Sequence, residues 1–155
     1  MMPLDIERGR SSAWRVMATA CALIGLGAGL VAGPQAAAQR PSKSVWDGVY
    51  TDAQAKRGKV LYDQGCTTCH SGGDQAPALY GSDFLKDFDG QTLADLFDRI
   101  KRSMPQDKPG SLTPQETADV LAYVLSFTFP VGKTELDRET APLEQIGFEA
   151  TKPKP

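Results

Sequence analysis

Five consecutive residues, Cys66-Thr67-Thr68-Cys69-His70, constrain this chain more than any other feature. Two cysteines separated by two residues and followed at once by a histidine form the attachment motif of a c-type haem. Each thiol adds to one of the two haem vinyl groups, and the histidine is then held beneath the iron as its proximal ligand. We therefore predict one covalent haem c, with Cys66 and Cys69 as thioether donors and His70 as an iron ligand.

Other uses of paired cysteines agree less well with the sequence. A structural zinc site needs four ligands, mostly Cys or His, but the chain has only one histidine and one further cysteine, Cys21. A thioredoxin-like pair belongs beside a βαβ pattern, whereas the residues around Cys66 are typical of helix and loop. Haem attachment is the interpretation that remains favoured.

The first 38 residues resemble a secretory signal. Three arginines precede an uncharged, mostly apolar run from Val16 to Val31, and Ala36-Ala37-Ala38 offers a cleavage site before Gln39. The apolar run is about 16 residues long, whereas a membrane span needs about 20. We expect cleavage and export to the bacterial periplasm, with an uncleaved membrane anchor as the less favoured alternative.

Residues 39–155 are long enough for one domain and too short for two. A domain of this size buries a limited core, so the haem would form much of its interior. These residues carry 14 Lys and Arg against 17 Asp and Glu, a net charge of −3. Nucleic-acid binding needs a clustered basic face, so we predict no nucleic-acid partner, and membrane contact only if the signal is uncleaved.

Capping signals and apolar residues at helical spacing predict three helices, over residues 51–65, 92–103 and 113–129. The first and third begin with a threonine followed three residues later by Gln or Glu, a capping box, and a proline follows the third cap. Gly58 lies inside the first helix, where glycine costs about 1 kcal/mol relative to alanine. We therefore expect another helix to cross closely at Gly58.

The other segments are predicted to be irregular, and no segment predicts a strand. Residues 71–90 are expected to form a loop with at most a short turn. The charged C-terminal extension is expected to dock in part through Leu143, Ile146 and Phe148. The expected organisation is a signal (1–38), an irregular N-terminal arm (39–50), a helical domain (51–130) and the extension (131–155).

The iron ligand opposite His70 decides between electron transfer and catalysis. Met104 is the only methionine after the signal, at the end of the second predicted helix. A methionine is usually core filler, but this one stands at a Met-Pro step beyond the apolar stripe that would line the haem. We predict Met104 as the distal iron ligand, which raises the reduction potential and leaves no coordination site for a substrate. The protein is then an electron-transfer protein and not an enzyme.

Together these motifs resemble class I c-type cytochromes over roughly residues 51–129. The resemblance rests on the pentapeptide, the preceding helix with Gly58, the Met104-Pro105 step and the helix with Tyr123. It implies an all-α, small cytochrome c fold, in which the N- and C-terminal helices cross around one covalent haem, and we expect Gly58 to lie against Tyr123 at the crossing. It also implies that the carbonyl of Pro77 accepts the N–H of the proximal histidine.

Two further segments, 44–50 and 104–112, are similar to single-haem bacterial cytochromes that accompany quinoprotein dehydrogenases. The resemblance implies a periplasmic one-electron carrier whose redox donor and acceptor are a dehydrogenase, an oxidase or another cytochrome, and we expect it to be monomeric when free. One alternative is a haem subunit of a larger oxidoreductase. Another is a ligand-binding or peroxide-handling haem protein with a displaceable Met104, although no second histidine exists for peroxide cleavage.

Four cations lie close to Met104 in the sequence. Two interpretations are open. The four side chains form an ordinary solvated helix face, or they have a function, which is to neutralise haem carboxylates or to present a basic rim to an acidic partner. These residues are Arg99, Lys101, Arg102 and Lys108.

Overall fold

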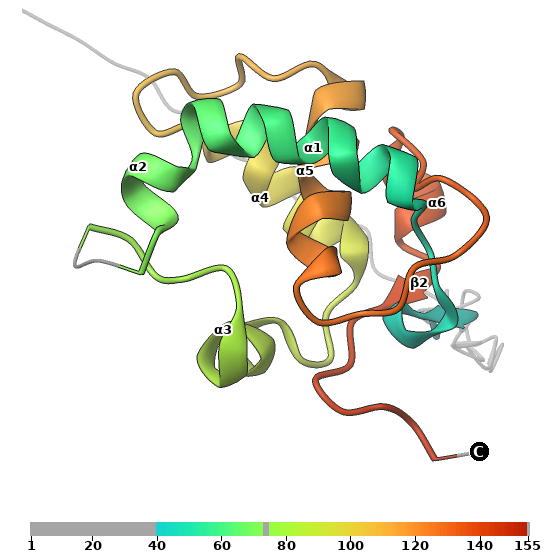
Figure 1. Ribbon diagram of the computed structural model, residues 1–155. Coiled ribbons are helices and arrows are strands. Elements are labelled where there is room, and N and C mark those ends of the chain that lie inside the picture. The colour runs from blue at the N-terminus through green and yellow to red at the C-terminus, as the bar shows by residue number, and fades with distance from the viewer. Residues whose placement is uncertain (1–39, 73–74, 155) are drawn as a thin grey trace, which may run out of the picture. The chain divides into compact units, whose positions relative to one another are not determined.

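Helices make up most of the part of the chain that the structure describes (Figure 1). The computed structural model describes residues 40–72 and 75–154, which belong to one unit of the chain, residues 36–155. The predicted signal, residues 1–38, lies outside the described residues. No helix within them is long and apolar enough to cross a membrane.

The all-α fold class is confirmed, and the three predicted helices correspond to α1, α4 and α5. The third helix ends at Ser126, three residues earlier than expected, because the backbone of Phe127 already caps it. In chain order the elements are β1 (Lys43–Ser44), η1 (Val45–Asp47, a 3-10 turn), α1 (Asp52–Gly65), α2 (Thr67–His70), α3 (Gly81–Phe88), α4 (Leu93–Ser103), α5 (Pro114–Ser126), α6 (Thr140–Leu143) and β2 (Ile146–Gly147).

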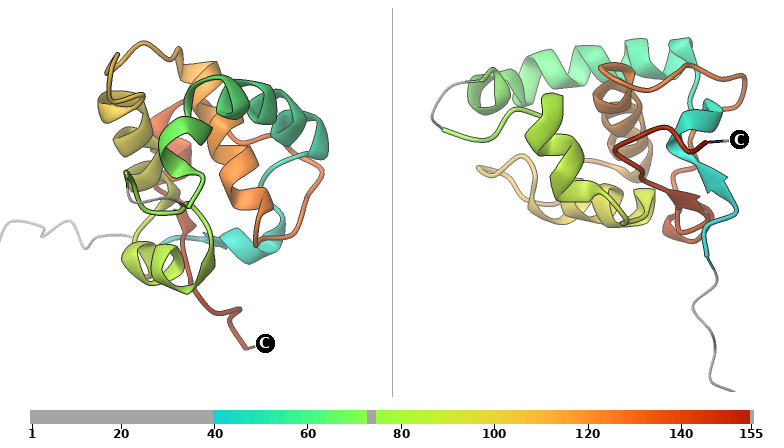
Figure 2. Two further views of the ribbon diagram at one scale, coloured as in Figure 1. Left: turned by 60° about the vertical axis from the view of Figure 1, so that its left-hand side comes forward. Right: turned by 90° about the horizontal axis from the view of Figure 1, so that it is seen from below.

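The largest helix–helix contact is the crossing of α1 over α5 (Figures 1 and 2). A Cβ atom at Gly58 would clash with the carbonyl of Asp119, so only glycine allows this approach. The predicted crossing at Gly58 is confirmed, but the expected partner, Tyr123, is wrong. Tyr123 lies one turn further along α5 and packs edge-on against Tyr62, with ring centroids 5.1 Å apart.

The two predicted capping boxes have different outcomes. On α5, Thr113 N–H donates to Glu116 Oε2 at 2.8 Å and Glu116 N–H donates to Thr113 Oγ1 at 3.2 Å, so that box is complete. On α1, Thr51 Oγ1 accepts from Gln54 N–H at 3.1 Å, but the Gln54 side chain does not return the bond. It is buried and bonds both backbone groups of Leu136 instead, at 2.7 and 3.1 Å, so the second half of the predicted box is wrong.

The N-terminal arm and the C-terminal extension are joined in a substructure that we call the clasp (residues 40–50 and 131–150). Strand β1 pairs in parallel with β2, with Lys43 opposite Ile146. Trp46 Nε1–H donates to the carbonyl of Glu149 at 2.9 Å, and Gly132 N–H donates to that of Tyr50 at 2.7 Å. The predictions of an irregular arm and of no strand are therefore wrong, since β1 pairs with β2, about 100 residues further along the chain, and Gly147 of β2 also bridges Thr92.

An aromatic core lies under the clasp. Phe148 has no exposed surface and contacts the rings of Phe84, Phe88 and Phe129 at centroid distances of 5.2–6.0 Å, and Trp46 adds an edge-on contact to Phe129 at 4.9 Å. The predicted docking of the extension is confirmed, because Leu143, Ile146 and Phe148 are all buried. Phe84 and Phe88 belong to α3, an eight-residue helix where only a loop was expected.

Candidate functional site

A cavity of about 690 Å³ opens where the end of α1 and α2 meet the loop that follows α4. Four predicted donor residues line it together: Cys66, Cys69, His70 and Met104. The volume lies within the range of about 300–1,000 Å³ that is typical of small-molecule and cofactor sites. The apolar part of its wall includes Ala76, Leu79, Ile100 and Val120.

The cysteines reach this cavity because α1 passes almost directly into α2. Cys66 N–H still donates to the Tyr62 carbonyl of α1 at 2.8 Å, and its own carbonyl accepts from Cys69 N–H and His70 N–H at 3.2 and 2.9 Å. One helical turn thus places residues three and four apart on the same side. Both cysteines are free and half-buried. Burial, and secondarily the neighbouring Cys69, raises the pKa of the Cys66 thiol and favours its protonated form.

The orientation of His70 leaves one ring nitrogen for a ligand. The imidazole is buried, and its Nδ1 lies 2.7 Å from the carbonyl oxygen of Pro77, the contact that the resemblance implies. A carbonyl can only accept, so Nδ1 carries the proton and Nε2 keeps its lone pair. Metal-bound histidines commonly show this arrangement, because the outer hydrogen bond fixes the tautomer and the ring orientation.

Tyr62 contacts the backbone of the same turn. Its hydroxyl donates a long hydrogen bond of 3.4 Å to the carbonyl of His70. Burial of the ring, and then the proximity of Cys66 and other acidic groups, raises the pKa of Tyr62 to about 12. The hydroxyl therefore remains a donor at neutral pH. The sequence does not reveal this role of Tyr62, since a contact to a backbone carbonyl has no sequence signature.

Met104 approaches the cavity from a different element. It caps the C-terminus of α4, where its N–H donates to the Ile100 carbonyl at 3.0 Å and its backbone turns to an extended conformation. Its side chain is half-buried and, like Ile100, lines the cavity. The Met-Pro step that ends the helix thus brings a thioether to the same space as the imidazole of His70.

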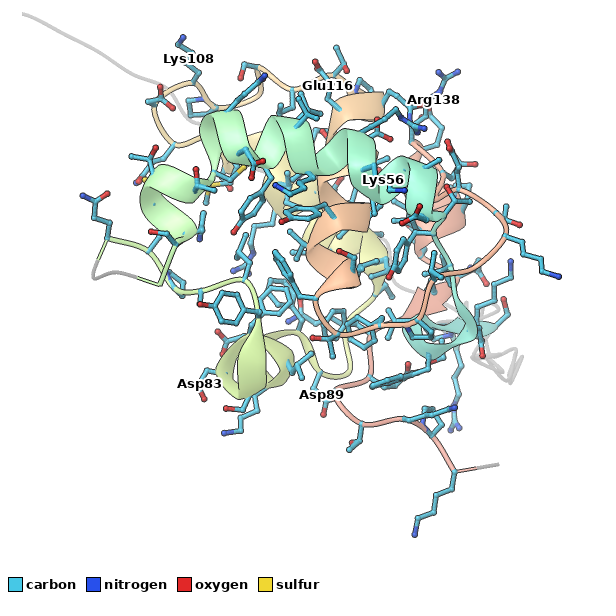
Figure 3. All side chains as sticks on the ribbon, viewed as in Figure 1. Lys56, Asp83, Asp89, Lys108, Glu116 and Arg138 are labelled. Atoms are coloured by element: carbon cyan, nitrogen blue, oxygen red, sulfur yellow. The ribbon has the colours of Figure 1, made fainter. Side chains whose placement is uncertain are left out.

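Of the four cations near Met104, only Lys108 is among the described residues that line the cavity (labelled in Figure 3). Arg102 Nη2 forms an ion pair with Asp98 at 2.6 Å. Arg99 lies over the ring of Phe88 at 5.2 Å, and Lys101 lies over that of Phe97 at 5.6 Å.

Sequence reasoning missed the part of the cavity wall formed by Ala76 and Leu79. They lie in the segment predicted as loop, where no helical or strand period reveals which side chains turn inward. The only available signal was the apolar run of residues 76–79 directly after a glycine-rich stretch.

The residues present agree with a covalently attached haem. The cavity offers two thiols on one turn, an imidazole with a free Nε2, a thioether from another element and apolar walls. Among residues 40–72 and 75–154, no group of three or more His, Cys, Asp or Glu side chains is placed to hold a metal ion.

Residues 53–124 match the family model described as Cytochrome C oxidase, cbb3-type, subunit III. The match supports a c-type cytochrome domain over this region. No curated protein and no solved structure matches the chain. The matched region contains every residue that lines the cavity and excludes both parts of the clasp. A domain of this family supports haem-based electron transfer with redox partners.

Proposed function

We propose that this protein is a periplasmic one-electron carrier with a single covalent haem, held by thioethers to Cys66 and Cys69 and ligated by His70 and Met104. The observation that carries the proposal is that these four side chains, from α2 and from the end of α4, line one cavity. A haem bound there supplies an iron that accepts and donates one electron.

Each residue has a defined part in this proposal. The Pro77 carbonyl, 2.7 Å from Nδ1, holds the His70 ring so that Nε2 faces the ligand. The half-buried Met104 would supply a thioether to the iron of a bound haem, and the iron would then have no position for a substrate or an external ligand. Leu79 and Ile100 contribute apolar wall that keeps water away from the site. The low polarity and the thioether both favour a raised reduction potential.

The spectrum of a Met104→Ala variant tests the ligation. The unmodified protein, purified with its haem, is expected to be six-coordinate and low-spin in both oxidation states and to bind carbon monoxide slowly or not at all. Met104→Ala should bind carbon monoxide readily. Its reduction potential should decrease, by an amount smaller than the roughly 0.8 V that different axial ligands span.

Leu79→Ala is the matched control, because it also shortens a cavity-lining side chain but removes no donor atom. It should keep the low-spin spectrum. High-spin iron and rapid carbon monoxide binding in the unmodified protein would instead favour a ligand-binding or peroxide-handling role with a displaceable Met104. Haem that acid–acetone extraction removes would contradict covalent attachment.

A second candidate role is that of a haem subunit in a larger oxidoreductase, and the description of the matching family, an oxidase subunit, favours it. The proposed donor for a free carrier is a quinoprotein dehydrogenase. Purification under mild conditions from its natural host, followed by sizing, separates the two roles. A free carrier elutes as a monomer that begins at Gln39, whereas a subunit elutes with its neighbours.

A further inference from the structure

A row of aromatic rings leads from the His70 turn to the protein surface. Tyr62 packs edge-on against Tyr123 with centroids 5.1 Å apart, Tyr123 against Phe127 at 4.9 Å, and Phe127 against Tyr80 at 5.8 Å. At the outer end, Tyr80 is 49% exposed and Phe127 is 40% exposed, and both rank among the most exposed large apolar side chains described. We call Tyr80, Tyr123 and Phe127 the aromatic patch.

The aromatic patch lies beside the polypeptide that carries His70, and not at the cavity mouth. The inner ring of the row, Tyr62, bonds the His70 carbonyl, and the Tyr80 hydroxyl lies against Gly72, where a Cβ atom would be 3.2 Å away. None of the three patch residues is among the described residues that line the cavity. The domain therefore has a second surface close to the proposed proximal ligand.

Two acidic side chains lie on α3, the helix that begins directly after Tyr80 of the patch. Tyr80 caps the start of this helix, and Asp83 and Asp87 follow one turn apart on one helical face, both exposed (Asp83 is labelled in Figure 3). Lys86 pairs with Asp83 at 3.5 Å, while Asp87 has no ion pair within the described part of the chain. The net charge of Asp83, Lys86 and Asp87 is therefore negative, and we call these three side chains the acidic border of the patch.

The other border of the patch is neutral. Lys59 lies over the Tyr123 ring, 5.9 Å from its centroid, and is paired with Asp63 at 2.5 Å. The acidic border therefore gives the surroundings of the patch a net negative charge. The cavity mouth differs in sign, because the cation Lys108 is exposed there.

We propose that the aromatic patch docks a redox partner protein whose contact surface is apolar and rimmed by lysine or arginine. Aromatic side chains are enriched at interface centres and carry much of the binding energy, and complementary charge at the rim steers the encounter. A second copy of this chain would set the acids of α3 against each other, which disfavours self-association. A partner docked there would lie beside the chain that carries His70, and a bound haem would exchange one electron with the partner's redox centre, with no bond made or broken.

This inference rests on the proposed electron-transfer function, and stopped-flow kinetics separates the two. The probe is a small basic redox protein with a lysine-rimmed, apolar contact face. Tyr80→Ser with Phe127→Ser is expected to lower the second-order rate constant about tenfold, equivalent to removing one modest interface hot spot. Asp83→Asn with Asp87→Asn should lower it several-fold at low salt and flatten its dependence on ionic strength.

Matched controls keep the result specific. Val60→Ser alters an apolar side chain that is 56% exposed outside the patch and should leave the rate unchanged. Tyr80→Phe keeps the ring and should retain most of the rate. Glu139→Gln with Glu144→Gln removes two exposed acids at α6 and should not change the salt dependence.

A binding measurement gives an independent readout. Titration of the ¹⁵N-labelled holo-protein with the basic probe should shift the amide resonances of the aromatic patch more than those of residues 104–108. Three results would each overturn the docking inference. The first is the reverse pattern of shifts, and the second is equal rate constants for the serine double variant and Val60→Ser. The third is a dimer of the unmodified protein that dissociates in the serine double variant. Failure of the unmodified protein to be reduced by ascorbate and reoxidised by ferricyanide would overturn the proposed function instead.

Discussion

The cavity side of the helical domain and the clasp are built in opposite ways. The cavity side is made of contiguous chain: α1 runs into α2, and Met104 follows directly from α4, so local turns place the donors around a volume of about 690 Å³. The clasp joins residues about 100 positions apart and fills its interior with rings from Trp46 to Phe148. One region leaves a cavity between its donor side chains, and the other is filled by aromatic rings, because Trp46 and Phe148 of the clasp pack against Phe84, Phe88 and Phe129.

Removal of the haem attachment should have the largest effect and should divide the two regions. In a Cys66→Ala, Cys69→Ala, His70→Ala variant, α2 and residues 104–112 lose the contacts that the haem would supply. We expect their opening free energies to fall toward zero, as in locally unfolded segments, while β1, β2 and Phe148 keep protection. Hydrogen exchange followed by mass spectrometry measures both at once. A uniform loss of protection would show that the clasp also depends on the haem.

Truncation inside the clasp is the converse test. Phe148→Ala leaves a cavity in the aromatic core and should cost about 3–5 kcal/mol of unfolding free energy, because Phe148 has no exposed surface. Urea denaturation followed by circular dichroism measures the loss, and the visible spectrum should keep its low-spin form. Val131→Ala is the control, because this side chain is 55% exposed. It should lower the free energy of unfolding by less than about 0.5 kcal/mol, as is usual for surface substitutions. A changed haem spectrum in Phe148→Ala would show that the two regions are coupled.

The helix crossing links the two regions, and a single methyl group tests how tightly. Gly58→Ala places its Cβ against the Asp119 carbonyl, so α1 and α5 must move apart. We expect the free energy of unfolding to fall by about 1–3 kcal/mol. Protection from hydrogen exchange should decrease on the cavity side and in the clasp together.

Gly65→Ala in the same helix is the matched control, because its Cβ would meet only Pro105 Cγ at an ordinary 3.8 Å. It should be neutral or should stabilise the helix by up to about 1 kcal/mol. Equal thermal melts for Gly58→Ala and the unmodified protein would contradict the close approach.

The smallest expected effect concerns the ion pair that attaches the extension to α1. Arg57 bonds both Asp119 and Glu135, at 2.9 Å each, and this hydrogen bonding lowers the pKa of the Glu135 carboxyl. A lowered native pKa contributes stability above the unfolded value of roughly 4.3, and the contribution is lost as the pH falls through the native pKa. Because Glu135 and Arg57 are exposed, the gain is about 0.5 kcal/mol or less.

Thermal melts of Glu135→Gln measure this contribution. The variant should melt slightly below the unmodified protein at pH 7, and the difference should shrink as the pH falls below the unfolded pKa of roughly 4.3. Glu144→Gln, at an exposed carboxylate of α6, should follow the unmodified protein at both pH values. A difference that grows at low pH would contradict the assigned sign.

The parts predicted well are those specified by adjacent residues. The Thr113–Glu116 box and the turn from Cys66 to His70 depend on hydrogen bonds within four positions, so the sequence determines them directly. The roles of His70 and Met104 as iron ligands remain predictions, although both residues lie at one cavity.

The parts predicted poorly depend on distant partners. Strands of two residues show no period, and β1 exists only because β2 pairs with it. Helix α3 carries Phe84 and Phe88 four residues apart, but Phe148, far along the chain, supplies the surface that buries them. Gln54 had a correct capping signal, yet the backbone of Leu136 competes successfully for its side chain.

The pairing of β1 with β2 also sets an order of events during synthesis. A polypeptide emerges N-terminus first, so Lys43 and Ser44 wait for Ile146 and Gly147 before they have a partner. Contacts of such sequence separation form slowly, whereas the turn from Cys66 to His70 needs only its own neighbours. The thiols of Cys66 and Cys69 are therefore presented on a turn that can form before residues 43–44 and 146–147 have paired.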